Sequence, residues 1–261
     1  MVNVVTDVYD SIDSIIEYEQ IRTFFQPIVS LKDASILGYE ALSRGPAGSL
    51  LEQPNILFKA AAESNRLWEL EYLCRLKAIE RSIGISGTKK LFINVDPKVI
   101  LDERYKIGFT KELLAANGID PTNIIFEITE RTCVEDYRGF FTVISNYTDQ
   151  GYEIAIDDTG AGYSGLRMLA EIHPQYIKID MELVRDIDKK RINQALIKAL
   201  RDFADSTGMA VIAEGIETGE ELNTLIQLGV GYGQGYLLQR PSEQLEDLDF
   251  NIKVLIRSRQ K

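Results

Sequence analysis

Polar side chains, most of them acidic or amide, recur in this chain at the carboxyl end of nearly every apolar segment that reads as a strand. The residues concerned are Glu40, Asn94, Glu127, Asp157, Asp158, Lys178, Glu214 and Gln234. Each of them alone is typical of a helix cap or a solvated loop. If they converge on one cavity, however, their carboxylates repel one another unless protons or bound cations neutralise them. Oxygen ligands without imidazole or thiolate suit Mg²⁺ or Mn²⁺ rather than Zn²⁺.

The adjacent pair Asp157 and Asp158 is the most specific of these features. Consecutive side chains point to opposite sides of a continuing strand, so both carboxylates reach one centre only where the strand ends and the backbone turns. In that position they fit a centre with two metal ions about 3.5–4 Å apart. The glycines of the following DDTGAGYSGL segment permit a tight loop. An ordinary Asp-rich turn is the competing interpretation.

Other kinds of catalytic site have little support in the sequence. His173 is the only histidine and precedes Pro174, which is typical of a turn or packing residue rather than of a catalytic triad or a zinc site. Cys74 and Cys133 are far apart, which favours two buried thiols in a reducing compartment over a disulfide. The chain contains no GxxxxGK[ST] segment, and the glycines of GVGYGQG lack dinucleotide-binding spacing.

The composition is that of a globular protein, with 45% apolar and 26% charged residues among 261. The net charge of −11 argues against a duplex nucleic acid as partner, because phosphate-backbone binding needs a cationic face. A small phosphorylated ligand is compatible with it once cations neutralise the site. No apolar run approaches the roughly 18 residues needed to span a bilayer, and no signal peptide or lipidation motif begins the chain. We therefore expect a cytoplasmic protein.

The periodicity of apolar residues outlines the elements that must position these side chains. An amphipathic helix at Ile12, Ile15 and Ile16 precedes two strands, FFQPIVS and ILGYEAL, whose short LKDAS connection makes them antiparallel. Helices are predicted over 55–62, 67–83, 190–207 and 220–228. The remaining six predicted strands are KLFINV, NIIFEIT, YEIAID, YIKID, MAVIA and GYGQGYL.

Successive starts of these six strands lie 22 to 33 residues apart, the scale of strand-helix crossover units that build a parallel sheet. Eight strands without a Pro/Gly/Ser-rich linker favour a closed barrel over an open doubly wound sheet. The sequence therefore predicts an α/β fold, a modified TIM (β/α)8-type barrel with an antiparallel first strand. We expect the barrel over 18–249, with a helix or linker stub at 1–17 and another at 250–261. Whether the chain is a fragment of a larger protein is left open.

Seven segments, taken in order, resemble the EAL domain, the cyclic di-GMP phosphodiesterase family. They are YEALSR, FINVDP, FEITER, IDDTGAGYSGL, YIKID, AEGIET and GYGQGYLLQRP. The resemblance covers roughly residues 18–249 and implies the same modified barrel. It also implies hydrolysis of cyclic di-GMP to linear pGpG, with two Mg²⁺ or Mn²⁺ ions per active site.

The resemblance also implies a role for individual residues. One metal would be held by Glu40, Asn94, Glu127 and Asp157, and Asp157 would bridge to a second metal held by Asp158, with Glu214 nearby. Lys178 would orient the attacking water or help to deprotonate it. Glu130 would tether the loop after Asp158, and Glu217 would support the site. The substrate would be bound by Arg44, which grips a phosphate, and by Gln26, Leu42, Gln234 and Pro241.

One departure from the family pattern lies inside a signature segment, where Thr159 occupies a position that is usually aromatic. A phenylalanine there could bury roughly 150 Å² or more, so we expect a looser loop after Asp158. The LLQRP ending departs modestly as well, which affects base contacts.

Two alternatives to the enzyme stay open: a catalytically silent cyclic di-GMP receptor, and an unrelated barrel that stabilises an enolate with Mg²⁺ and a lysine. The complete acidic set and the order of the motifs favour the enzyme. The oligomeric state, including a homodimer, and a regulatory domain outside this chain are also open.

Overall fold

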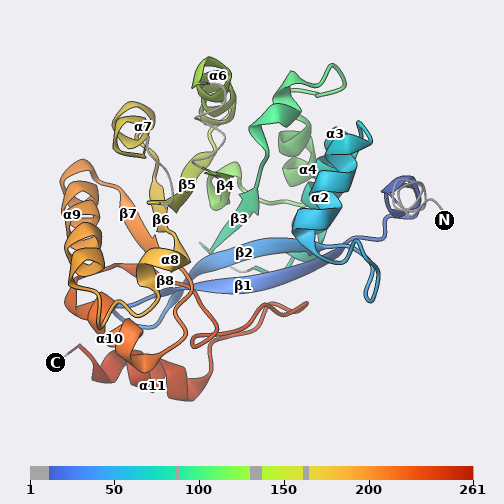
Figure 1. Ribbon diagram of the computed structural model, residues 1–261. Coiled ribbons are helices and arrows are strands. Elements are labelled where there is room, and N and C mark those ends of the chain that lie inside the picture. The colour runs from blue at the N-terminus through green and yellow to red at the C-terminus, as the bar shows by residue number, and fades with distance from the viewer. Residues whose placement is uncertain (1–11, 86–88, 130–136, 161–164, 261) are drawn as a thin grey trace, which may run out of the picture.

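The computed structural model describes residues 12–85, 89–129, 137–160 and 165–260. Eight strands form a closed barrel in sequence order, and helices surround it (Figure 1). β1 runs antiparallel to both of its neighbours, β2 and β8, while the other neighbouring pairs are parallel. The structure therefore confirms the predicted modified barrel with an antiparallel first strand. The strands are β1 (Arg22–Ser30), β2 (Ile36–Arg44), β3 (Lys90–Asn94), β4 (Ile124–Thr129), β5 (Glu153–Thr159), β6 (Tyr176–Ile179), β7 (Ala210–Ala213) and β8 (Tyr232–Gly233).

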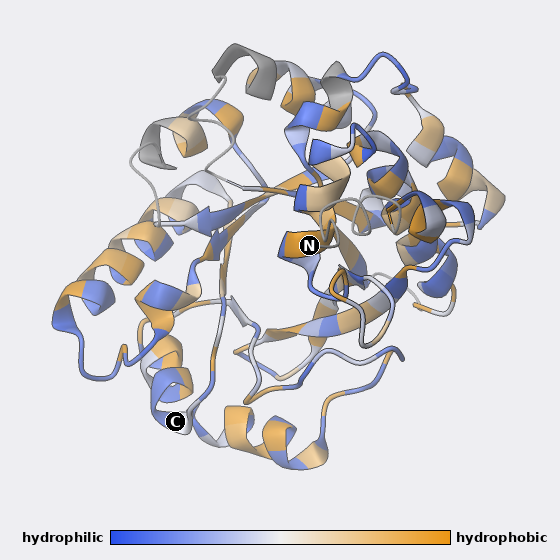
Figure 2. Ribbon diagram, turned by 45° about the vertical axis from the view of Figure 1, so that its right-hand side comes forward, coloured by the Kyte–Doolittle hydropathy of each residue, from blue (hydrophilic) through white to orange (hydrophobic). Residues whose placement is uncertain are grey.

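Most of the helices contribute buried apolar residues to the core around the barrel, and Figure 2 shows hydrophobic and hydrophilic residues mixed along them. The predicted helices are all present, with ends shifted by one or two residues. The helices are α2 (Pro54–Glu63), α3 (Leu67–Arg81), α4 (Phe109–Ala116), α6 (Tyr137–Thr148), α7 (Gly165–Ile172), α8 (Met181–Val184), α9 (Arg191–Thr207), α10 (Gly219–Gln227) and α11 (Phe250–Ser258), with short 3₁₀ turns at Pro97–Leu101 and Pro121–Asn123.

An apolar layer fills the interior of the barrel directly below the polar residues singled out above. It consists of Ile28, Phe92, Ile125, Ala155, Tyr176 and Ile212. In β3 to β7 a polar residue follows the apolar layer residue by two positions in the sequence, as Lys178 follows Tyr176. In the antiparallel β1 the order is reversed, and Gln26 precedes Ile28 by two positions. Since side chains two positions apart share one face of a strand, the polar residues form the next layer upward. The sequence thereby places a layer of polar side chains directly above a layer of apolar side chains inside the barrel.

The predicted place of Glu40 at the end of its strand is wrong. Glu40 lies in the middle of β2, which continues to Arg44 because β1 pairs with it over its whole length, down to the pair Arg22 and Arg44. The hairpin therefore extends beyond the carboxyl ends of the neighbouring strands, whereas β3 stops at Asn94.

The predicted last strand is shorter than expected, since only two residues pair. A Cβ at Gly235 would lie 2.2 Å from the backbone nitrogen of Ile216, so the chain there presses against the loop after β7.

Thr159 is part of β5 rather than of a loop, and only 3% of its surface is exposed. It pairs with Ile179 of β6, and its carbonyl accepts the amide of Asp180 at 3.4 Å. The strand therefore fixes Thr159 without an aromatic ring. The expected looseness concerns the loop that follows, of which residues 161–164 lie outside the described residues.

Both ends of the described chain are packed, the first against helices α2 and α3 and the last against the barrel. Residues 12–17 are helical, and Ile12 and Ile15 are buried in a cluster with Leu57 and Leu70. At the other end Ile256 of α11 is fully buried. The domain boundaries at 18 and 249 stay a prediction. No helix in the described ranges is both long and apolar enough to cross a bilayer.

His173 and Cys74 have the structural roles expected of them. His173 is exposed, follows the end of α7 and has a φ of 51°, which places it in a turn before Pro174. Cys74 is a buried free thiol on α3. Cys133 falls outside the described residues.

Candidate functional site

Lys178 lies at the centre of the polar layer and is fully buried. Its Nζ is 2.7 Å from a carboxylate oxygen of Glu127 and 2.7 Å from one of Glu214. Asp157 and Glu40 follow at 3.4 and 3.5 Å. One ammonium therefore faces four carboxylates contributed by four different strands or strand ends. The net charge of this cluster is negative when all five groups are ionised, which is the electrostatic condition for binding cations.

Two amides, Asn94 and Gln234, connect the carboxylates into a network. Asn94 Nδ2 donates to Glu40 at 2.9 Å and to Glu127 at 3.2 Å. Gln234 Nε2 donates to Glu40 at 2.8 Å and to Gln26 at 3.0 Å. Each amide nitrogen thus bridges two acceptors from different strands. The bonds fix the positions of the carboxylate oxygens before any ligand arrives.

The cluster shifts the pKa values of its members in opposite directions. Burial and the charge of Glu40 raise the pKa of Glu127 well above its ordinary value. Burial also raises the pKa of Glu214, to about 8, despite the opposing effect of Lys178. For Glu40 burial is outweighed by Lys178 and by the amides of Gln234 and Asn94, so its pKa falls. Burial works to lower the pKa of Lys178, but the four carboxylates prevail and raise it well above its ordinary value. Lys178 is accordingly an ammonium group.

A β-bulge brings Asp157 and Asp158 to the same side. The predicted turn of the backbone is present, but β5 does not end there: the pairing of β5 with β6 is irregular between Ile156 and Thr159, and Asp158 has a φ of 56°. One oxygen each of Asp157, Asp158 and Glu214 lies within 4.8 Å of the others. This spacing fits a divalent cation between hard oxygen ligands. The buried oxygens Glu127 Oε1 and Asp157 Oδ1 in the same cluster face the Lys178 ammonium, at 2.7 and 3.4 Å.

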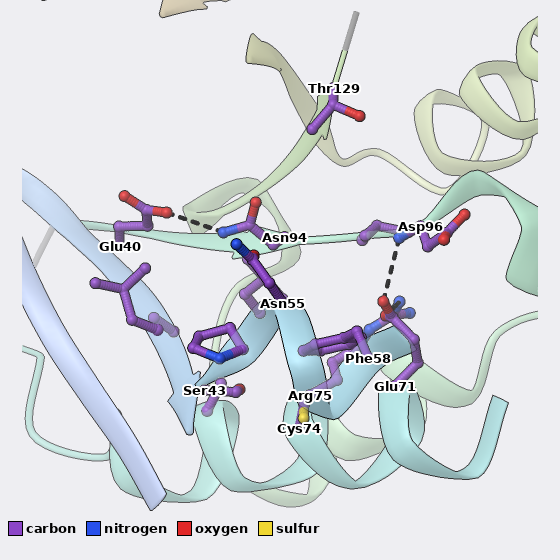
Figure 3. A pocket seen from close by; sticks show the side chains of 16 residues that line it. Glu40, Ser43, Asn55, Phe58, Glu71, Cys74, Arg75, Asn94, Asp96 and Thr129 are labelled. Atoms are coloured by element: carbon purple, nitrogen blue, oxygen red, sulfur yellow. Dashed lines mark hydrogen bonds and ion pairs between the residues drawn. The ribbon is translucent and has the colours of Figure 1, made fainter. Parts of the chain in front are cut away.

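A cavity of about 450 Å³ opens beside this cluster. Glu40 and Asn94 line one side of it, and Glu71 and Asp96 line the opposite side (Figure 3). Leu42 is also part of its wall. A site of this size, with apolar walls and a few polar groups, is suited to a small organic ligand whose charged part reaches the carboxylate cluster.

Glu71 of α3 connects the cavity wall to the end of β3. Its carboxylate accepts the backbone amide of Asp96 at 3.2 Å and lies 3.7 Å from Arg75. Arg75 is itself buried, between the rings of Phe109 and Phe126. Burial raises the pKa of Glu71 to about 7, although Arg75 and the amide oppose this shift.

The pKa of Glu71 predicts a pH-dependent stability. The folded chain binds this proton more tightly than the unfolded chain, whose carboxyl titrates near 4.5. Its stabilising contribution is therefore complete at low pH and is lost as pH rises towards 7. Glu71→Gln cannot titrate, so its stability relative to the parent should improve by roughly 2 kcal/mol between about pH 5.5 and pH 8. Urea unfolding at both pH values measures this.

The matched control is Glu80→Gln, an exposed carboxylate on the same helix. It should leave the difference from the parent independent of pH. If Glu71→Gln also keeps a constant difference, the raised pKa of Glu71 is wrong.

Three of the predicted site residues do not touch the carboxylate cluster in the described structure, and a fourth is not described. Arg44 lies farther along β2, with its guanidinium 4.8 Å from the ring centre of Phe24. Pro241 stands beside the bridge between Phe25 and Ser242, next to the segment whose Gln239 carbonyl accepts a hydrogen bond from Gln26 at 3.0 Å. Glu217 has an exposed side chain. Glu130 falls outside the described residues.

Glu221 is a buried residue of this region that the sequence analysis missed. Its carboxylate accepts the amides of Glu217, Thr218 and Asp186 at 2.9 to 3.0 Å. It thereby holds the loop between Glu214 and α10. Thr218 and Glu221 form a capping box, and the TGEE segment that encodes it is a recognisable helix start. Glu221 thus holds the backbone of Glu217, and the supporting role expected of the Glu217 side chain stays a prediction.

Comparison with known proteins gives consistent matches to one family. The model of the EAL domain matches residues 10–241. The probable cyclic di-GMP phosphodiesterase PdeB of Escherichia coli is 31% identical over 231 residues, which are 86% of this chain and 43% of PdeB. The chain thus spans less than half the length of this curated relative.

Solved structures show the same similarity in three dimensions. BlrP1 of Klebsiella pneumoniae, in a complex with calcium and cyclic di-GMP, superposes with a TM-score of 0.81 and 31% identity over 88% of this chain and 58% of BlrP1. A complex of BlrP1 with manganese and cyclic di-GMP gives the same score. A standalone EAL protein from Vibrio cholerae, bound to cyclic di-GMP, has a TM-score of 0.76 and 32% identity over 89% of this chain and 97% of that protein.

Proposed function

The chain belongs to the EAL domain family, and from this premise we propose that it is a metal-dependent phosphodiesterase that hydrolyses cyclic di-GMP to linear pGpG. The observation that carries the proposal is the buried cluster of four carboxylates around Lys178, joined to the Asp157, Asp158 and Glu214 group beside an open cavity. The relatives solved with cyclic di-GMP and with manganese or calcium support it.

The donor set of the cluster fits two divalent cations, Mg²⁺ or Mn²⁺. Glu40, Asn94, Glu127 and Asp157 would hold one of them, and Asp157 and Asp158, with Glu214 nearby, would hold the other. When bound, the cations would lower the pKa of a water molecule and polarise the phosphodiester. Their charge also offsets the dianionic substrate in a protein of net charge −11.

The remaining chemistry falls to side chains of this chain. The water oxygen forms the new bond to phosphorus, the bond from phosphorus to the 3′-oxygen breaks, and the 3′-oxygen takes up a proton. The Lys178 ammonium donates hydrogen bonds and so orients the attacking water, while its charge balances the carboxylates. Arg44 binds a substrate phosphate through its planar fork of donors. Gln26, Leu42, Gln234 and Pro241 would line the nucleotide site, and Glu130 would tether the loop after Asp158.

One assay tests this proposal against its alternatives. The protein is incubated with cyclic di-GMP and Mg²⁺ or Mn²⁺, with and without excess chelator, and the products are separated by chromatography. Formation of pGpG that stops in chelator supports the enzyme. Binding without conversion replaces the proposal with a receptor, and the absence of both binding and conversion rejects cyclic di-GMP as the ligand of this family member. Undiminished hydrolysis in chelator would contradict the metal requirement.

A further inference from the structure

The β1–β2 hairpin presents a series of side-chain pairs on the face that lines the barrel interior. Gln26 pairs with Glu40 at the level of the carboxylate cluster, Phe24 with Leu42 above it, and Arg22 with Arg44 at the top. The three pairs share one face because their members stand two positions apart along each strand. The Cα of Arg44 is thus about 13 Å along the strand from that of Glu40, above the mouth of the barrel.

Two arginines contact the ring of Phe24 but differ in their other partners. The guanidinium of Arg44 is 4.8 Å from the ring centre, and that of Arg22 is 5.0 Å from it. Arg22 also forms ion pairs with Glu243 at 2.7 Å and with Glu52 at 3.3 Å. Arg44 has no carboxylate partner in the described part of the chain. The charge of Arg22 is therefore compensated, whereas that of Arg44 is available to a ligand.

We propose that Phe24 is a positioning residue that holds Arg44 at the mouth of the site in a conformation ready to bind the phosphate of cyclic di-GMP. This proposal rests on the proposed function and on the role given there to Arg44. The face of an aromatic ring attracts a guanidinium through its quadrupole and restricts its orientation. The ring uses none of the N–H donors of the guanidinium, so all of them stay free for phosphate oxygens.

A carboxylate in place of Phe24 would hold Arg44 equally well but would neutralise it and occupy its donors. The contrast with Arg22 illustrates this within the same hairpin, since Glu52 and Glu243 bind its guanidinium nitrogens. The pairing of Arg22 also lowers the repulsion between two cations that stand directly opposite each other on neighbouring strands. Phe24 thus orders the ligand-binding arginine, and the two acidic residues neutralise the other one.

The experiment measures the affinity for cyclic di-GMP by isothermal titration in Ca²⁺, where we expect binding without turnover, and kcat and KM in Mg²⁺. Phe24→Leu should raise Kd by roughly two- to five-fold, the range of an exposed cation–π contact. Phe24→Tyr, which keeps the ring, should bind as the parent does. Arg44→Ala should raise Kd between about 10- and 100-fold.

The double variant Phe24→Leu/Arg44→Ala separates positioning from a merely structural role. If Phe24 acts through Arg44, the double variant binds as weakly as Arg44→Ala alone. In Mg²⁺, Phe24→Leu should raise KM while kcat stays within about two-fold of the parent, because the phosphate is charged before the reaction begins.

Each other outcome overturns the inference. The role of Phe24 would be rejected if Phe24→Leu binds cyclic di-GMP as tightly as the parent does while Arg44→Ala binds it weakly. The proposed function would stay intact in that case, provided that the parent binds and hydrolyses cyclic di-GMP. Additive losses in the double variant would show that Phe24 acts independently of Arg44. A parent without binding or turnover would reject the proposed function, and the inference with it.

Discussion

Lys178→Met is expected to lower kcat for cyclic di-GMP by about 10²–10⁴-fold at saturating metal, with a much smaller change in Kd for the substrate. The reason is the position of the ammonium, which is buried and lies 2.7 Å from oxygens of both Glu127 and Glu214. A hydrogen-bond donor fixed in a water-excluded site stabilises charge that develops during the reaction. Steady-state kinetics in Mg²⁺ and titration with cyclic di-GMP in Ca²⁺ measure the two effects separately.

Saturating metal is needed because Lys178 also lowers the pKa values of Glu127 and Glu214. Without it these carboxyls hold their protons more tightly, and a metal ion must displace them. The control is Lys90→Met: Lys90 also pairs with a strand carboxylate, Glu153, at 3.0 Å, and lies at the amino-terminal end of β3. Lys90→Met should keep the parent kcat. A Lys178→Met variant with normal kcat would reduce Lys178 to a residue that balances charge.

The alternation of apolar and polar residues explains why so much of the fold could be predicted. Tyr176 and Lys178 stand two positions apart on one strand, and the same spacing recurs around the barrel. A local pattern that repeats in every strand needs no knowledge of distant contacts. The antiparallel first strand also follows from local information, since only a short turn separates β1 from β2.

Features that depend on contacts between distant segments could not be predicted in the same way. The continuation of β2 beyond Glu40 depends on its pairing with β1, and the bulge at Asp158 depends on the register between β5 and β6. Glu71 reads as a solvated helix residue in the sequence, yet it is 5% exposed because α3 packs on the barrel beside Asp96. Thr159 was expected to be part of a loop, and the pairing of β5 with β6 makes it a buried strand residue, while the expected looseness of the loop that follows stays a prediction.

Phe24 illustrates the same limit within the proposed substrate site. Its spacing from Arg44 in the sequence carries no signal, because twenty residues separate them. Only the antiparallel register brings Arg22, Phe24 and Arg44 together on one face. Local motifs thus identify the residues that can bind a metal or a phosphate, whereas tertiary pairing determines which residues hold them in position.

Glu40→Ala should abolish measurable turnover at ordinary Mg²⁺ concentrations, a loss on the order of 10³-fold or more, while the barrel stays folded. The fold should tolerate the change because Lys178 keeps Glu127 and Glu214 as partners at 2.7 Å. Removing Glu40 also removes a negative charge that raises the pKa of Glu127, which relieves repulsion inside the cluster. Thermal unfolding without metal should therefore give a midpoint close to that of the parent.

Activity should nevertheless be lost, because Glu40 contributes both charge and order to the cluster. It supplies one of the proposed oxygen ligands, and it accepts hydrogen bonds from Asn94 at 2.9 Å and from Gln234 at 2.8 Å. Without it the Asn94 amide keeps only its longer hydrogen bond to Glu127, at 3.2 Å, so a second proposed ligand is held less firmly once the first is gone. Calorimetric titration should show weaker Mn²⁺ binding, and high Mn²⁺ should restore only part of the rate.

The matched control is Glu153→Ala, which removes a carboxylate at the opposite end of the barrel. This variant should bind Mn²⁺ and hydrolyse the substrate as the parent does. Parental Mn²⁺ affinity and rate in Glu40→Ala would remove Glu40 from the metal site and contradict the proposed assignment of the two-metal centre.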